Sequence, residues 1–236
     1  MRKPWIAYSM LGFAGGTLVG LGTIPAAGAA TLPDTLGGAI AYAQGQISAR
    51  VATLNLLANR VADSTAIDAS DRSALDSIIG NTSSGDIAGL EALSAKVGAE
   101  TTLAAVRSDL HEVYATYRIY AVVRPQVDLV LAGDSEVRIV ADLSSLEAPL
   151  QTLIDQSGAP QAAVAAYQRY VSDIGAATTA IGTIPAQALA VTPGSFNADP
   201  SATHAVLQSD WHSLGVARSD LIDARTQIAA IIKVLG

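Results

Sequence analysis

The stretch LQSDWHSLGVARSDLIDARTQIAAIIKVL, residues 207–235, decides the fold of this chain. An apolar residue recurs in it at every seventh position: Leu207, Leu214, Leu221, Ile228 and Leu235. Such a period is typical of a helix that packs one side along a neighbouring helix. The stretch therefore predicts a long C-terminal helix in a bundle, with a left-handed supercoil.

The same period occurs near the start of the chain, between residues 34 and 61. Its apolar positions are Ile40, Ile47, Leu54 and Val61. Arg50 interrupts this stripe, and we expect its stem to follow the core edge while its guanidinium reaches water. The sequence thus predicts an all-α, elongated helical bundle with coiled-coil-like heptad helices at both ends of the mature chain. These two helices can pack together, or pair between two chains.

Between these ends, apolar stripes and turn residues predict further helices. We expect Ser70 or Asp71 to cap one, and others over residues 86–97, 102–120, 125–153 and 160–181. The segment 119–131 is rich in β-branched residues, which favours a strand. It has no matching strand partner elsewhere, so we interpret it as two helices that meet at Arg124 and Pro125. Residues 192–200 (TPGSFNADP) predict a loop.

The first thirty residues have the layout of a secretory signal peptide. Arg2 and Lys3 precede an apolar run over residues 6–24, and small residues follow over 26–30. We expect export by the general secretion route and cleavage of this leader. Cleavage leaves residues 31–236 as a single helical-bundle domain in the envelope or medium. The alternative is a retained membrane anchor, in which Gly12, Gly16 and Gly20 would form a helix-packing face.

Charge and composition exclude several kinds of partner. The formal net charge is −7, and it becomes −9 without the leader, with 12 basic residues against 21 acidic ones. This balance argues against nucleic acid and against anionic membrane surfaces, so a membrane partner is expected only if the leader is retained. The chain has no cysteine, so packing rather than disulfides must stabilise it.

The residues that could perform chemistry are scattered. His111, His204 and His212 lack the spacing of a metal site, and thiolate ligands are absent. No nucleophile elbow, phosphate-binding loop or dinucleotide fingerprint is present in the sequence. We therefore expect no catalytic residues, no cofactor and no metal.

One segment suggests recognition, the run YATYRIYAVVR over residues 114–124. Its candidate interaction patch consists of Tyr114, Tyr117, Arg118, Tyr120 and Arg124. Tyrosine and arginine are favoured at binding hot spots. The alternative is that the tyrosine rings fill gaps in the core while their hydroxyls find partners at its rim.

Two further stretches, GLEALSAKVGAETTLAAVRSDL with YRIYAVVRPQVDLVLAGD, and ALAVTPGSFNADPSATHAVL with ARSDLIDARTQIAAII, cover most of the mature chain. They resemble segments of uncharacterised secreted helical proteins of high-GC Gram-positive (actinobacterial) bacteria. This resemblance implies export, a helical fold and an envelope or extracellular setting. It implies no activity and no site residue.

These observations lead to one expected function and one alternative. We expect a non-enzymatic, exported cell-envelope or extracellular helical protein that acts as a scaffold, spacer or protein-interaction module. Its partner would be another protein, or a second copy bound through helical surfaces. The alternative is a secreted helical protein that binds a small molecule or a metal.

Overall fold

The computed structural model describes residues 33–80 and 85–236. Every regular element within these residues is a helix, which confirms the predicted all-α helical bundle. The predicted supercoil stays a prediction. Pro33–Gly236 forms one compact unit. The predicted leader, with Gly12, Gly16 and Gly20, lies outside the described residues.

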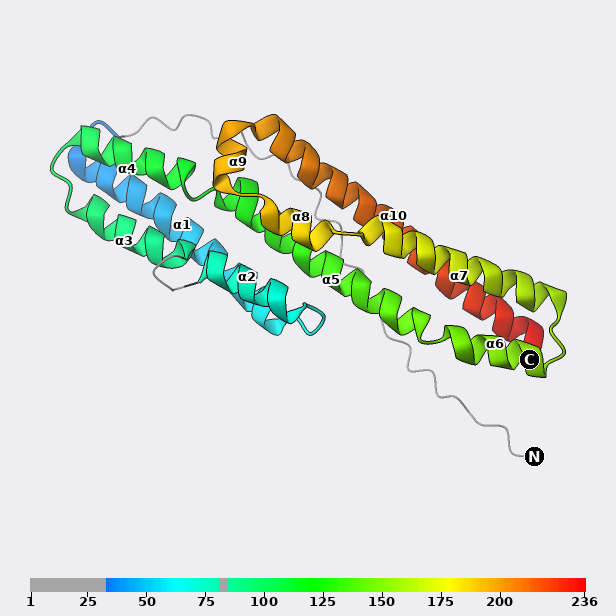
Figure 1. The fold of residues 1–236 in the computed structure, drawn as a ribbon. Coiled ribbons are helices and arrows are strands. Elements are labelled where there is room, and N and C mark those ends of the chain that lie inside the picture. The colour runs from blue at the N-terminus through cyan, green and yellow to red at the C-terminus, as the bar shows by residue number, and fades with distance from the viewer. Residues whose placement is uncertain (1–32, 81–84) are drawn as a thin grey trace. The chain divides into compact units, whose positions relative to one another are not determined.

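In the N-terminal half of this unit, one long helix packs against three shorter ones (Figure 1). The four helices are α1 (Leu36–Asp63), α2 (Ala69–Ile79), α3 (Asp86–Gly98) and α4 (Leu103–Ala115). Ile47, Leu54 and Val61 of the predicted stripe are buried on α1. The seven-residue period therefore identified the core face of this helix.

Helix α2 begins with a cap that the sequence analysis missed. Its N-cap is Asp68, not Ser70 or Asp71, and the Asp68 carboxylate accepts a hydrogen bond from the Ser70 backbone N–H at 2.8 Å. The Asp68 backbone N–H donates in turn to the Asp134 carboxylate at 2.9 Å. This second bond attaches the start of α2 to the C-terminal half of the unit.

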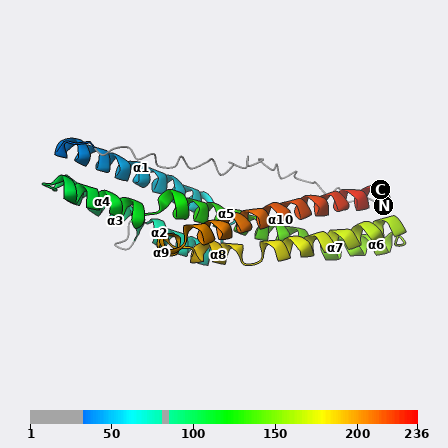
Figure 2. The same ribbon diagram turned by 90° about the horizontal axis from the view of Figure 1, so that it is seen from above.

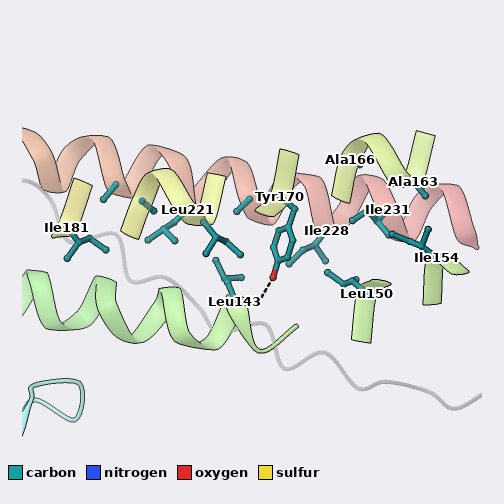
Figure 3. Packing of buried hydrophobic residues seen from close by; sticks show 14 residues of the cluster. Leu143, Leu150, Ile154, Ala163, Ala166, Tyr170, Ile181, Leu221, Ile228 and Ile231 are labelled. Carbon is teal, nitrogen blue, oxygen red and sulfur yellow. Dashed lines mark hydrogen bonds between the residues drawn. The ribbon is translucent and has the colours of Figure 1, made fainter. Parts of the chain in front are cut away.

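The C-terminal half is built on two long antiparallel helices, α7 (Gln161–Ile181) and α10 (Pro200–Leu235) (Figures 1 and 2). Helix α5 (Arg124–Ser144) packs against both. Their apolar core is shown in Figure 3. Four of the five heptad residues that predicted α10 are buried: Leu207, Leu214, Leu221 and Ile228. No helix in the described part of the chain is long and apolar enough to cross a bilayer.

The two terminal long helices do not lie along each other, contrary to one expectation from the heptads. Helix α1 packs on α2, α3 and α4, whereas α10 packs on α7 and α5. Each terminal helix thus covers its apolar stripe with helices that are nearer to it in sequence. Helix α5 connects the two groups (Figures 1 and 2).

The single helix predicted over residues 125–153 is wrong, because the chain breaks after Ser144 and resumes as α6 (Glu147–Gln156). Pro149 is the local cause. It has no N–H, and its ring would clash with the carbonyl of Ser145 in a continuous helix. The buried Tyr170 hydroxyl donates a hydrogen bond to the Leu143 carbonyl, as Figure 3 shows, so this helix end is satisfied inside the core.

The predicted loop over residues 192–200 contains a short helix, α9 (Pro193–Ala198). Thr192 and Ser195 form a capping box, with Pro193 in the first turn, and this combination starts the helix. Before it, α8 (Ile184–Ala190) ends against α5. There the buried Gln126 amide donates to the carbonyls of Ala188, Leu189 and Val191.

An ion pair between a buried carboxylate of α5 and a partly exposed arginine of α10 joins these two helices. Glu136 is 2% exposed, and one of its carboxylate oxygens accepts hydrogen bonds from Nε and Nη2 of Arg218 at 3.0 and 2.9 Å. Its other oxygen is buried and has no hydrogen-bond partner. Among the described residues, only Arg218 provides a positive charge that pairs with Glu136. The stability of this buried carboxylate therefore depends on Arg218.

Two helical glycines provide a matched test of packing. A β-carbon at Gly133 on α5 would lie 2.8 Å from the Pro185 ring, whereas one at Gly175 on α7 would meet nothing within 4 Å. We expect Gly175→Ala to raise the free energy of unfolding by about 1 kcal/mol through helix propensity. Gly133→Ala should lower the free energy of unfolding by about 1 kcal/mol, because overpacking against Pro185 outweighs the gain in helix propensity. Urea denaturation checks both, and equal shifts would contradict the contact with Pro185.

Candidate interaction surface

The predicted tyrosine–arginine segment does not form one helix face. Helix α4 ends at Ala115, and the helix predicted to run to residue 120 is therefore wrong. Arg118 lies at the centre of an inverse γ-turn, with φ −71° and ψ 50° and a 2.7 Å bond from the Ile119 N–H to the Tyr117 carbonyl. A short π-helix, η1 (Ile119–Val123), follows and leads directly into α5. This turn separates the tyrosines that the spacing had placed together.

Tyr114 and Tyr120 instead enclose an arginine of α1. The Arg50 guanidinium carbon lies 4.7 Å from the Tyr114 ring centroid and 5.3 Å from that of Tyr120. The Arg50 Nη1 atom donates to the backbone and side-chain oxygens of Gln46 at 2.9 and 3.1 Å. The residue is only 6% exposed, so the expectation that its guanidinium reaches water is wrong. The electron-rich faces of the two tyrosine rings stabilise the guanidinium charge in place of water.

Among the described residues, this arginine has no acidic partner. No carboxylate of a described residue lies within ion-pair distance of Arg50. Its Nε atom is buried and has no hydrogen-bond partner. Buried arginines are normally paired. Arg50 therefore places an uncompensated positive charge just below the surface.

The hydroxyl groups hold both rings in position. The Tyr114 hydroxyl donates to the Gln46 side-chain oxygen at 3.3 Å, and the Tyr120 and Thr53 hydroxyls share a hydrogen bond of 3.4 Å. Burial, with the neighbouring Tyr42 hydroxyl, raises the pKa of Tyr114, although Arg50 acts in the opposite direction. The Tyr114 hydroxyl thus stays protonated and remains a donor at neutral pH.

The arrangement continues along the contact between α1 and α5. Asp128 forms ion pairs with Arg60 and, at 3.9 Å, with Arg124. The side chains of both arginines are 51% exposed. We call this surface the arginine–tyrosine seam. Its members are Arg50, Thr53, Leu56, Arg60, Tyr114, Tyr120, Arg124 and Asp128.

Two exposed apolar groups lie on the seam beside these charges. Leu56 of α1 is 66% exposed and precedes Arg60 by one helical turn. Tyr120 is 38% exposed. The seam therefore offers two apolar contacts and two accessible guanidinium groups, all positioned by helices.

Tyr117 and Arg118 of the predicted patch lie elsewhere. Tyr117 packs over α3, where a β-carbon on Gly89 would come within 2.3 Å of its hydroxyl oxygen. Arg118 donates to the Asn197 side chain at 2.8 Å, and its guanidinium lies 5.1 Å from the Phe196 ring centroid. The structure thus brings Tyr114, Tyr120 and Arg124 to the seam, and uses the other two residues for internal contacts.

The sequence analysis did not predict the α1 side of the seam. Arg50 was visible as the charged residue inside an apolar stripe, and that was the available signal. Leu56 was a second signal, because it lies off the stripe of its helix. The surroundings of Arg50 and Leu56 depend on how α1 packs against η1. The sequence pattern does not determine this packing.

No other arrangement in the described residues suggests chemistry. His204 shares a hydrogen bond with Gln208, and no group of three potential metal ligands gathers in the described part of the chain. A shallow hollow on α10 is lined by Ile222, Arg225, Thr226 and Ala229. It contains no convergent set of polar groups.

Comparison with known proteins gave no match to a family model, to a curated protein or to a solved structure.

Proposed function

We propose that this protein is a non-enzymatic protein-interaction module of the cell envelope or the extracellular space, and that the arginine–tyrosine seam is its binding surface. The observation that carries the proposal is the exposure of Leu56 and Tyr120 on the surface that also presents the half-exposed Arg60 and Arg124. Aromatic and arginine side chains contribute most of the binding energy in many protein interfaces.

The seam is suited to binding because its tyrosines are held before a partner arrives. Ordering a flexible side chain at an interface costs about 0.5–1.5 kcal/mol. Arg50 stacks against the Tyr120 ring, and Thr53 bonds its hydroxyl, so much of this ordering already exists in the free protein. A partner therefore loses less binding energy to the ordering of this surface.

The extracellular setting rests on the predicted leader over residues 1–30. Export would place the seam where it meets other envelope or secreted proteins. N-terminal sequencing of the natural protein tests this part of the proposal. A start at Ala30 or Thr31 supports a released domain, an intact Met1 in the membrane fraction supports an anchored one, and cytosolic protein with Met1 contradicts export.

Site-specific photo-crosslinking in cells that produce the protein tests the binding surface. A photoreactive residue at Leu56 is expected to give a discrete adduct, and the same residue at Leu153 on α6, which is 43% exposed, serves as the control. Tyr120→Ala with Arg124→Ala should reduce the Leu56 adduct at least about tenfold, since two hot-spot residues are lost. The proposal fails if Leu56 gives no adduct, or one that these changes leave intact.

A further inference from the structure

The seam has an excess of positive charge, although the whole chain is acidic. It contains three guanidinium groups, those of Arg50, Arg60 and Arg124, and the carboxylate of Asp128. Asp128 contacts two of these arginines, and no carboxylate among the described residues lies within ion-pair distance of Arg50. A partner for this surface should therefore provide several carboxylates and at least one apolar side chain.

A surface of the opposite character lies on α7 and α10. Asp220 and Asp223 lie three residues apart on α10 and so share one side of that helix. Burial, with these two carboxylates, raises the pKa of Asp173 on α7, whereas Arg169 lowers it. None of these three carboxylates forms an ion pair with a described residue. Val216, one turn before Asp220, is 42% exposed. We call Asp173, Val216, Asp220 and Asp223 the acidic face.

The seam and the acidic face are complementary in charge. One combines three arginines with one aspartate, and the other combines three aspartates with the nearby Arg169. Val216 on the acidic face matches Leu56 and Tyr120 on the seam. The two surfaces share no helix, because the seam residues lie on α1, α4, η1 and α5, whereas the acidic face lies on α7 and α10. Within one molecule, no ion pair joins a seam arginine to a carboxylate of the acidic face.

We infer that the seam binds the acidic face of a second copy of this chain. This inference rests on the proposed function and names the partner. Because the two surfaces differ, the contact is head-to-tail, so one copy keeps a free acidic face and the other keeps a free seam. Such contacts extend into a linear assembly unless their rotation closes a ring.

Ionic strength provides the first test. Sedimentation velocity on the purified protein in its natural form should show a mean mass that rises with concentration at about 20 mM salt. The rise should be lost at about 300 mM salt, where the screening length is shorter. A monomer at every concentration in low salt, or association that does not respond to salt, would overturn the inference.

Two single-face variants provide the sharper test. The seam variant carries Arg60→Gln and Arg124→Gln, and the acidic variant carries Asp220→Asn and Asp223→Asn. Each should be monomeric alone, because the two surfaces that it would join no longer match. A mixture should form a one-to-one dimer and nothing larger, since only one functional surface of each kind remains.

Controls separate loss of binding from loss of folding. Circular dichroism melts must match the parent protein, and Arg107→Glu, at an exposed position of α4, should leave assembly unchanged. Self-association of either variant alone, or a mixture that stays monomeric, would overturn the inference. If the protein is monomeric but Leu56 cross-links to a different protein, the inference fails and the proposed function stands. If neither occurs, both fail.

Discussion

Arg218→Ala is expected to lower the free energy of unfolding by about 3 kcal/mol. The reason is the position of Glu136, which is 2% exposed and receives both of its hydrogen bonds from Arg218. Removing the arginine leaves a buried carboxylate without a counter-charge. Breaking such a pair from one side costs far more than the intact pair contributes.

Urea denaturation followed by circular dichroism measures this loss. Lys233→Ala, at an exposed position of the same helix, is the control and should change stability by less than about 0.5 kcal/mol. Adding Glu136→Gln to the Arg218→Ala variant should recover about half of the loss, because the amide carries no charge. A loss below about 1 kcal/mol, typical of exposed ion pairs, would contradict the buried character of this pair.

Tyr170→Phe is expected to cost about 1 kcal/mol, because it removes one hydrogen bond to the buried Leu143 carbonyl, which keeps the bond from the Leu146 backbone N–H at 2.9 Å. The ring itself is retained, so the core in Figure 3 keeps its shape. Tyr167→Phe is the matched control, since its ring lies 6.3 Å from that of Tyr170 and is only half-buried. A loss no larger than that of the control would contradict the bond.

The same tyrosine gives a distinct dependence on pH. Burial raises the pKa of Tyr170 to about 12, above its ordinary value of 10.0. The folded state therefore holds the phenol proton more tightly than the unfolded state. The stability that this provides is complete below pH 10 and is lost as the pH rises toward 12, by about 3 kcal/mol. The difference in free energy of unfolding between the parent protein and Tyr170→Phe should therefore close over this pH range. A difference that stays constant would contradict the raised pKa of Tyr170.

The fold could be predicted where a pattern repeats over many residues. The stripes that include Leu54 and Leu221 identified the buried sides of α1 and α10, because burial of one helix side requires that period. The boundaries were less predictable. Pro149 ends a helix, and Thr192 with Ser195 starts one, and each such signal consists of one or two residues.

The candidate surface could be predicted only in part, because its residues come from separate elements. Tyr114, Tyr120 and Arg124 were identified from local composition, which reflects hot-spot chemistry. Their relation to Arg50 depends on the turn at Arg118, after which Tyr120 of η1 reaches the same arginine as Tyr114 of α4. Contacts between elements that lie more than sixty residues apart leave no periodic trace in the sequence.

The three hydrogen bonds from Gln126 also bear on the order in which the chain folds. Helix α8 has seven residues, too few for a helix to be stable alone in water. Its last carbonyls are satisfied by a side chain that precedes them by more than sixty residues. We therefore expect helix α8 to form only once α5 is in place. We expect α5 to serve as the template on which the segment between α7 and α10 is completed, late in folding.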